Sequence, residues 1–339
     1  MTRRHEDLDE DDVRVRPGKG KSRARSKIRP VYSEVVPAMV TTVDRGRFTT
    51  SPLASPTSRA FAVKARELGR KGIAVGDEVD LVGQTAGGDD ELARIVKRHG
   101  RRSVLRRSAD DNDPVERVVV ANADQLAIVV AAADPEPRPR LIDRAIIAAF
   151  DGGLQPVLVV TKTDLASPDE LLERYQPLEI PLLARTKNDP LEAVLEVLAH
   201  HTTVLLGHSG VGKSTLVNKL VPEAVRATGE VNAVTGRGRH TSTSAVAFAL
   251  DEGGWVVDTP GIRSFGLAHV DLSRFMRAFP DLERGTEQCP RGCTHDDEHC
   301  ALDEFVANGG AEHSRLVSLR LLLASRSDGS SDLGGATKG

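Results

Sequence analysis

The middle of this chain alternates apolar runs with amphipathic segments. Residues 125–133 and 156–160 are almost continuously apolar, and a helical pattern over 141–150 separates them. Strands that are apolar on both faces are typical of a parallel sheet that helices cover on both sides. We therefore expect a central α/β domain over residues 115–268.

The flanking parts of the chain show other patterns. Between residues 38 and 105, short runs of alternating apolar and polar residues are separated by Gly, Pro and Asp. About five such strands suit an OB-type β-barrel, which we expect over residues 37–107. Beyond 270 the chain becomes polar and helical, which predicts a small helical domain over 269–325. The chain is therefore expected to be multidomain.

The two ends of the chain have compositions that cannot build a hydrophobic core. Six acidic residues lie within 6–12, and residues 14–29 hold eight Lys or Arg and no acid. We expect residues 1–36 to be a disordered charged tail, which is either simply solvated or an arm that contacts RNA. The Gly- and Ser-rich residues 326–339 are expected to be a flexible end.

The composition as a whole points to no special environment. The 339 residues carry a net charge of -3, with 28% charged residues, so no overall field indicates a partner. No apolar run approaches the roughly 18 residues that a membrane span needs, and no signal peptide is visible. We expect a cytoplasmic protein that does not bind membranes and acts as a monomer.

A phosphate-binding pattern follows the apolar run that ends at Leu206. The eight residues from Gly207 to Ser214 fit G-x-x-x-x-G-K-[ST], and a helix should begin directly after them. Backbone N–H groups of such a loop hold phosphates, while Lys213 is expected to reach the β- and γ-phosphates and Ser214 to hold Mg²⁺. We assign His208 no catalytic role. The predicted nucleotide contacts here are Gly207, His208, Ser209, Gly210, Val211, Gly212, Lys213, Ser214 and Thr215.

The run that ends at Val160 is followed by Thr161-Lys162-Thr163-Asp164. This segment resembles the N-K-x-D motif that recognises guanine. The Asp164 carboxylate can accept two hydrogen bonds from guanine, which adenine cannot supply, and the Lys162 stem can lie against the base. Thr161 replaces the usual Asn, so we expect some hydrogen bonds that brace the loop to be lost.

A third motif follows the apolar run Trp255–Val257. Asp258-Thr-Pro-Gly261 fits D-x-x-G, in which Asp258 would orient Mg²⁺ through water and the Gly261 N–H would meet the γ-phosphate. The three motifs together favour a P-loop GTPase over a general ATPase or a purely structural α/β domain.

All three cysteines lie close together near the C-terminus. An odd, clustered set argues against a disulfide framework. The spacing Cys289-x3-Cys293-x-His295-x4-Cys300 offers the Cys₃His ligands of a closed, structural Zn²⁺ site, with His299 as a rival fourth ligand.

The order of the motifs is unusual. Ordinary GTPases place the P-loop first and K-x-D last, whereas here K-x-D comes first, which indicates a circular permutation. With a β-barrel before it and a Cys/His cluster behind it, the chain over residues 38–325 resembles the RsgA/YjeQ family of small-ribosomal-subunit-dependent GTPases. The resemblance implies hydrolysis of GTP to GDP, stimulated by the small ribosomal subunit and its rRNA, late in subunit maturation. It also favours His295 as the fourth zinc ligand.

The resemblance also suggests a catalytic residue. Ile262 stands where Ras-like enzymes place the Gln that orients water, and an aliphatic side chain cannot do this. The segment 236–243 is similar to the family's G-x-G-x-H-T-x-T switch, in which the His is the proposed catalytic residue; this maps to His240. Either Thr241 or Thr243 should contact Mg²⁺ and the γ-phosphate. Residues 184–186, where the family backs the guanine, match poorly and receive no assignment.

A basic surface is predicted on the barrel, either for rRNA or as a merely solvated face. Two further functions stay open: a nucleotide-gated RNA-binding module with little turnover, and a zinc-dependent RNA chaperone. The basic residues at the end of the barrel are Arg94, Lys97, Arg98, Arg101, Arg102, Arg106 and Arg107.

Overall fold

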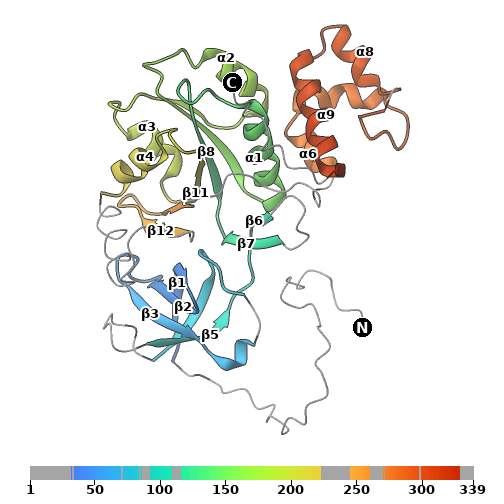
Figure 1. The fold of residues 1–339 in the computed structure, drawn as a ribbon. Coiled ribbons are helices and arrows are strands. Elements are labelled where there is room, and N and C mark those ends of the chain that lie inside the picture. The colour runs from blue at the N-terminus through green and yellow to red at the C-terminus, as the bar shows by residue number, and fades with distance from the viewer. Residues whose placement is uncertain are drawn as a thin grey trace, which may run out of the picture. The chain divides into compact units, whose positions relative to one another are not determined.

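A computed structural model describes the chain in two compact units (Figure 1). The first unit contains the chain up to Arg102, with Val120–Asn122 and Ser244–Ala247, and the second contains the remainder. The described residues are 32, 34–69, 72–83, 85, 92–108, 116–222, 245–259, 270, 272–297 and 299–328.

The first unit is a closed five-stranded barrel. Its strands follow the order β1-β2-β3-β5-β4, and β1 also pairs with β4, so the sheet closes on itself. The β3–β5 pair is parallel and the other pairs are antiparallel. This confirms the predicted OB-type barrel. The strands are β1 (Val36–Asp44), β2 (Arg47–Pro52), β3 (Ala60–Lys64), β4 (Glu78–Val82) and β5 (Ala93–Arg98).

The interior of the barrel is filled mainly by small and β-branched residues. Alternate side chains of each strand point inward, because successive residues of a strand face opposite sides. The narrow interior suits alanine next to a few larger side chains. The buried cluster is Ala38, Val40, Phe48, Ala60, Ala62, Val79, Leu81, Ala93 and Ile95.

Two arginines that we expected on the basic surface instead form ion pairs with a buried carboxylate. Arg101 donates from Nε to one oxygen of Asp77 at 2.7 Å and from Nη2 to the other at 2.9 Å, and Asp77 is completely buried. Arg98 lies 3.9 Å from the same carboxylate, with only 10% of its side chain exposed. A buried carboxylate requires such partners. Arg94 and Lys97 remain exposed.

The second unit contains a parallel sheet of order β10-β9-β8-β11-β13. Helices accompany the strands, as the alternating pattern predicts (Figure 1). A separate two-stranded sheet pairs β6 (Val104–Ser108) with β7 (Glu116–Ala121), and β12 spans Val246–Ala249. The elements of the parallel sheet and its helices are β8 (Gln125–Ala131), α1 (Pro139–Gly152), β9 (Gln155–Thr161), α2 (Asp169–Tyr175), β10 (Leu182–Ala184), α3 (Glu192–Leu198), β11 (Thr202–Gly207), α4 (Lys213–Leu220) and β13 (Trp255–Asp258).

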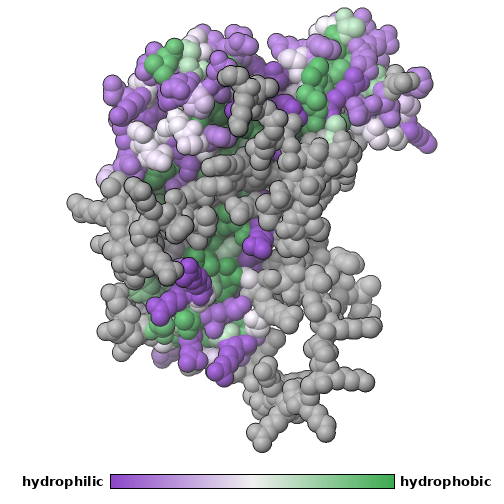
Figure 2. All heavy atoms as spheres, viewed as in Figure 1, coloured by the Kyte–Doolittle hydropathy of each residue, from purple (hydrophilic) through white to green (hydrophobic). Residues whose placement is uncertain are grey.

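The C-terminal part of this unit is helical, as expected. Hydrophilic side chains dominate much of its surface in Figure 2, although Val317 and Leu321 are each 41% exposed. Among the described residues, no helix is long and apolar enough to cross a membrane. The helices are α6 (Leu272–Arg277), α7 (Pro280–Glu283), α8 (Ala301–Ala307) and α9 (His313–Asp328), and short 3₁₀ turns cover Arg66–Leu68, Gln176–Leu178 and Arg284–Gln288.

A buried polar cluster joins α1 to α9. Arg315 donates to both oxygens of Asp281, at 3.0 and 3.2 Å, and its Nη1 lies 3.4 Å from Asp143 Oδ1. The Ser318 hydroxyl donates to the other Asp143 oxygen, and the Arg315 guanidinium lies 4.4 Å from the centre of the Phe279 ring. Burial raises the pKa of the Asp143 carboxyl, although Arg315 and Ser318 act against this rise. We call these residues the Asp143 cluster.

Arg315→Met should destabilise the protein strongly. The substitution leaves Asp143 and Asp281 without their main cation, and breaking a buried ion pair on one side costs about 3–5 kcal/mol. Asp303→Asn is the control, because Asp303 pairs with Arg320 where the side chains are 52% and 27% accessible, and a pair of this kind is worth at most about 1 kcal/mol. Thermal and denaturant unfolding of both variants would test this. Equal losses would show that the buried cluster adds no more than a surface pair.

Candidate functional site

The predicted nucleotide motifs meet at one edge of the parallel sheet. The P-loop follows β11, which lies between β8 and β13, and β9 is next to β8. Thr161–Asp164 therefore follows one strand of this edge, and Asp258 ends another. Ligands bind at the carboxyl ends of parallel strands. The sheet thus brings the three motifs together although their order along the chain is permuted.

The P-loop leads directly into α4, which begins at Lys213. Gly210 and Gly212 have φ values of +87° and +89°, a conformation that residues with a Cβ rarely adopt. Ser209 and Ser214 are exposed, so both hydroxyls are accessible to a ligand. The loop places the first N–H groups of a helix where they can bind phosphate.

Lys213 and Asp258 form an ion pair between the P-loop and the end of β13. Their side chains are 11% and 25% exposed, so each partly buried charge is neutralised by the other. In the predicted site both groups serve the phosphates and Mg²⁺. The pair shows that the two motifs lie within direct contact of each other.

Thr161 braces the Thr161–Asp164 segment with its hydroxyl. Its hydroxyl lies 2.6 Å from the Val211 carbonyl oxygen of the P-loop and 3.0 Å from that of Val130 at the end of β8. Because a hydroxyl has one proton, the shorter contact with Val211 is the better donor geometry. One small side chain therefore ties the base-recognition loop to the phosphate loop.

The other residues of this segment face the same edge. Lys162, at φ +55°, donates from Nζ to the backbone carbonyl of Asp134, in the segment between β8 and α1. Asp164 is exposed, so its carboxylate is open to a base.

The segment that received no assignment from the sequence lies against the guanine-recognition loop. The Thr163 N–H donates to the Arg185 carbonyl at 3.4 Å. Asp189 closes the following turn by accepting from the Thr186 N–H at 2.7 Å and from its hydroxyl at 2.6 Å, and these bonds lower the pKa of the Asp189 carboxyl. The signal available in the sequence was an Asp three residues after a Thr, which is typical of such a turn.

Several predicted residues lie outside the described part of the chain. These are His240, Gly261, Ile262, Thr241 and Thr243.

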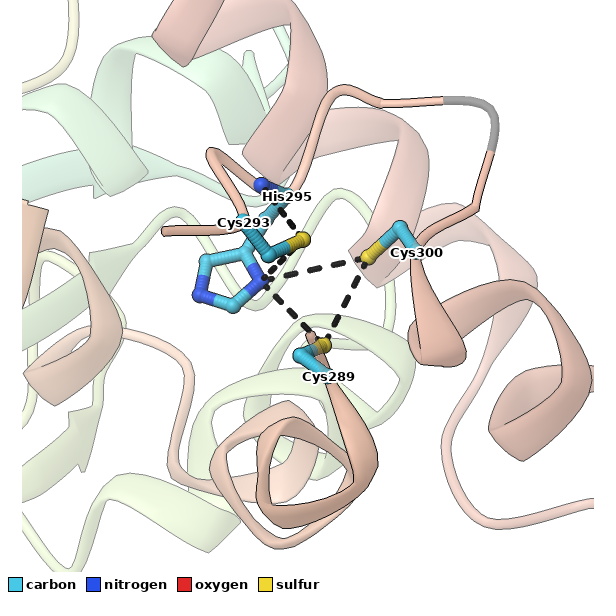
Figure 3. A group of neighbouring side chains, drawn as sticks. All are labelled: Cys289, Cys293, His295 and Cys300. Carbon is cyan, nitrogen blue, oxygen red and sulfur yellow. Dashed lines mark hydrogen bonds between the residues drawn. The ribbon is translucent and has the colours of Figure 1, made fainter. Parts of the chain in front are cut away.

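The four predicted metal ligands converge in the C-terminal helical region (Figure 3). Cys289 follows the 3₁₀ turn Arg284–Gln288, Cys300 is the N-cap of α8, and Cys293 and His295 come from the loop between them. All four ligand atoms lie within 4.8 Å of one another. The rival His299 is exposed and is not part of this group.

The spacing of these atoms fits a tetrahedral metal site. Nδ1 of His295 lies 3.7 Å from the sulfurs of Cys289 and Cys293 and 3.9 Å from that of Cys300. Zinc bonds of about 2.0–2.3 Å give tetrahedron edges of roughly 3.5–3.8 Å. Burial raises the pKa of the Cys293 and Cys300 thiols and lowers that of His295. These four residues could hold a metal ion that neutralises thiolates.

A second layer of contacts holds the metal-ligand loop. Arg320 of α9 donates from Nε to the His295 carbonyl at 3.1 Å and forms a two-bond pair with Asp303 of α8, at 2.7 Å each. Asp297 accepts from the Thr294 N–H at 2.8 Å. The loop is therefore tied to both neighbouring helices.

Comparisons with known proteins identify the family. The model of the RsgA GTPase family matches residues 98–268. A protein of Pseudomonas putida is 37% identical over 253 residues, which cover 72% of this chain and 73% of the relative. One of Pseudomonas aeruginosa is 38% identical over 248 residues, covering 70% and 72%. Both are named small ribosomal subunit biogenesis GTPase RsgA. This chain belongs to the RsgA GTPase family.

Two solved structures support the architecture. YjeQ from Thermotoga maritima is 25% identical, with a TM-score of 0.64 over 87% of this chain and 99% of that one. YloQ, described as a circularly permuted GTPase, has the same TM-score at 20% identity and shares the fold over 88% of this chain and 97% of its own. The predicted fold class, with a barrel, a permuted GTPase domain and a C-terminal helical domain, is confirmed. The protein is a GTP hydrolase.

Thr161→Val should weaken nucleotide binding. The substitution removes one hydroxyl while it keeps the shape of the side chain, and such a hydrogen bond is worth about 0.5–1.5 kcal/mol, or roughly 2- to 13-fold in affinity. Thr161→Ser keeps the hydroxyl and should bind nearly as well as the parent. Titration with a fluorescent GDP would measure both. Equal binding by all three proteins would show that the contact with Val211 is dispensable.

Proposed function

We propose that this GTPase binds the small ribosomal subunit and hydrolyses GTP to GDP and phosphate while that subunit matures. The observation that carries the proposal is the meeting of the P-loop, the K-x-D segment and Asp258 at one sheet edge, in a chain that also contains an OB-type barrel and a Cys₃His cluster. The names of the curated relatives support the choice of partner.

The nucleotide would bind with its phosphates on the P-loop. The N–H groups from Ser209 to Thr215 would surround the β-phosphate, Lys213 would neutralise the β- and γ-phosphates, and the Ser214 hydroxyl would help to hold Mg²⁺. The three N–H donors of Lys213 allow it to bind phosphate oxygens in place of, or beside, Asp258. Asp258 would help to hold Mg²⁺, and Gly261 would meet the γ-phosphate.

Guanine would be read by Asp164, whose exposed carboxylate accepts from the ring N–H and the amine. Lys162 lies along the base. Because Thr161 ties this loop to Val211, the base pocket and the phosphate loop are positioned by one contact.

The Cys₃His cluster is proposed to hold one structural Zn²⁺. The donor set and the edge lengths fit zinc, and four protein ligands leave no open position for catalysis. Zinc would stabilise a small helical region with few aromatic residues, because metal binding contributes directly to folding.

The barrel is proposed to contact rRNA. Arg94, Lys97 and Arg102 are exposed and can approach phosphates, although Lys97 lies 3.8 Å from Asp80 and Arg102 donates to the Asn122 carbonyl at 3.2 Å. Arg98 and Arg101 are largely buried against Asp77. A surface of this kind binds the nucleic acid backbone with a steep dependence on salt. We propose the domain boundaries 37–107, 115–268 and 269–325 as given above, and a cytoplasmic monomer.

The decisive measurement is GTP hydrolysis with and without purified small ribosomal subunits, with ATP as the control nucleotide. We expect stimulation of at least about tenfold that is specific to GTP. Tight nucleotide binding without stimulation would favour the second candidate, a nucleotide-gated RNA-binding module with little turnover. Binding to the subunit that depends on zinc and not on nucleotide would favour the RNA chaperone.

His240→Ala should slow hydrolysis and leave nucleotide affinity unchanged. We propose that the imidazole positions or polarises the attacking water in place of the missing Gln, and such a group contributes about 100-fold or more to the rate. Single-turnover hydrolysis with bound subunits would separate the chemical step from binding. A rate equal to that of the parent would remove His240 from the mechanism. His201→Ala, an exposed histidine just before β11, is the control.

A further inference from the structure

Helix α1 begins beside the nucleotide site. Lys162 of the guanine-recognition segment donates to the carbonyl of Asp134, in the segment that leads into the helix. A cavity beside the start of α1 is lined by residues of that helix, such as Leu141 and Ile142, and by residues of the P-loop, such as Gly207 and Val211. This end of α1 therefore borders both loops of the predicted nucleotide site.

The next residue of α1 faces the C-terminal helices. Asp143 is 1% exposed, and its two oxygens contact Arg315 and Ser318, both on α9. Arg174, at the end of α2, lies 3.9 Å from the same carboxylate and also donates to Ser314 at the start of α9, at 3.2 Å. The interface between α1 and α9 is thus centred on one carboxylate.

The same helix α9 reaches the metal-ligand loop. Arg320, five residues after Arg315, donates to the carbonyl of His295, which is one of the four ligands. Between these two arginines α9 is one continuous helix. A displacement of α9 at Asp143 would be carried to the Cys₃His loop, because a helix transmits motion as a rigid element.

The polar contacts between α1 and α9 determine how precisely the two helices are held relative to each other. An apolar contact of the same size would hold α9 at lower cost, since the Coulomb energy of a buried ion pair barely offsets the loss of hydration. Directional hydrogen bonds to Asp143, however, are satisfied in one arrangement of the two helices and broken in others. Packed interfaces of this kind have discrete states.

We propose that the Asp143 cluster couples the nucleotide site to the Cys₃His module, so that a structural change at one alters the other. A nucleotide that shifts the start of α1 changes the fit of Asp143 to α9, and α9 passes the change to the His295 loop. Coupling between binding sites is reciprocal. If nucleotide changes the affinity of the module for a partner by some factor, the bound partner changes the affinity for nucleotide by that same factor. Asp143, Arg315 and Ser318 are positioning residues in this scheme, since none of them reaches the phosphates.

The test is hydrogen exchange on the full chain purified with its metal, in the nucleotide-free, GDP and GMPPNP states and without ribosomes. In the parent protein, nucleotide should slow exchange at least about fivefold in α1 and also in α9. In Asp143→Asn the α1 effect should persist and the α9 effect should fall below about twofold. Asp143→Asn keeps the size of the side chain but cannot accept both bonds from α9.

A second variant, a control variant and two control measurements complete the test. Ser318→Ala removes one donor with little loss of packing and should weaken the α9 response in the same direction. Asp151→Asn makes the same change at the far end of α1 and should respond like the parent. Metal content and GDP affinity are measured on every variant. They distinguish a loss of coupling from misfolding of the Cys₃His module.

The proposal is overturned if exchange in α9 of the parent protein is the same in all three states. It is also overturned if Asp143→Asn and Ser318→Ala both retain the full α9 response. Because no ribosome is present, failure here leaves the proposed subunit-dependent function untouched. Conversely, a lost α9 response with normal GDP affinity would stand even if the small subunit proved to be the wrong partner.

Discussion

Parallel pairing of β9 with β8, of β8 with β11 and of β11 with β13 is the constraint on which the site depends. It places the ends of these strands at one edge, whatever the order in which the chain visits them. A permuted chain can therefore build the same site, because the site is defined by neighbouring strand ends and not by sequence order. The cost of permutation is that new connections must lie at the surface.

Two contacts at the carboxyl ends of these strands join the loop predicted to recognise the base and the loops predicted to bind the phosphates. Thr161 reaches Val211, and Lys213 reaches Asp258, so each loop is held by another loop. This interdependence explains why a Thr can replace the usual Asn: a hydroxyl is enough to donate to one carbonyl. The turn closed by Thr186 and Asp189 directly follows Arg185, whose carbonyl accepts from the Thr163 N–H.

Helix α9 has a central place in the second unit. One end of it contributes to the Asp143 cluster, and a later turn holds the His295 loop. The C-terminal helices bury apolar side chains such as Phe279, Leu302 and Leu319, and the directional polar contacts of α9 add to this packing.

The sequence alone determined the motifs, the alternation of strands and helices in the central domain, and the family. Local patterns carry this information: the Gly-rich loop, the apolar runs and the Cys spacing each specify structure within about a dozen residues. The sequence could not show that Arg101 and Arg98 pair with buried Asp77, because a buried arginine and an exposed arginine cannot be told apart in the sequence. It also could not pair Asp143 with Arg315, which lie 172 residues apart. Only the tertiary structure decides such pairs, since burial and distance arise when the whole chain has packed.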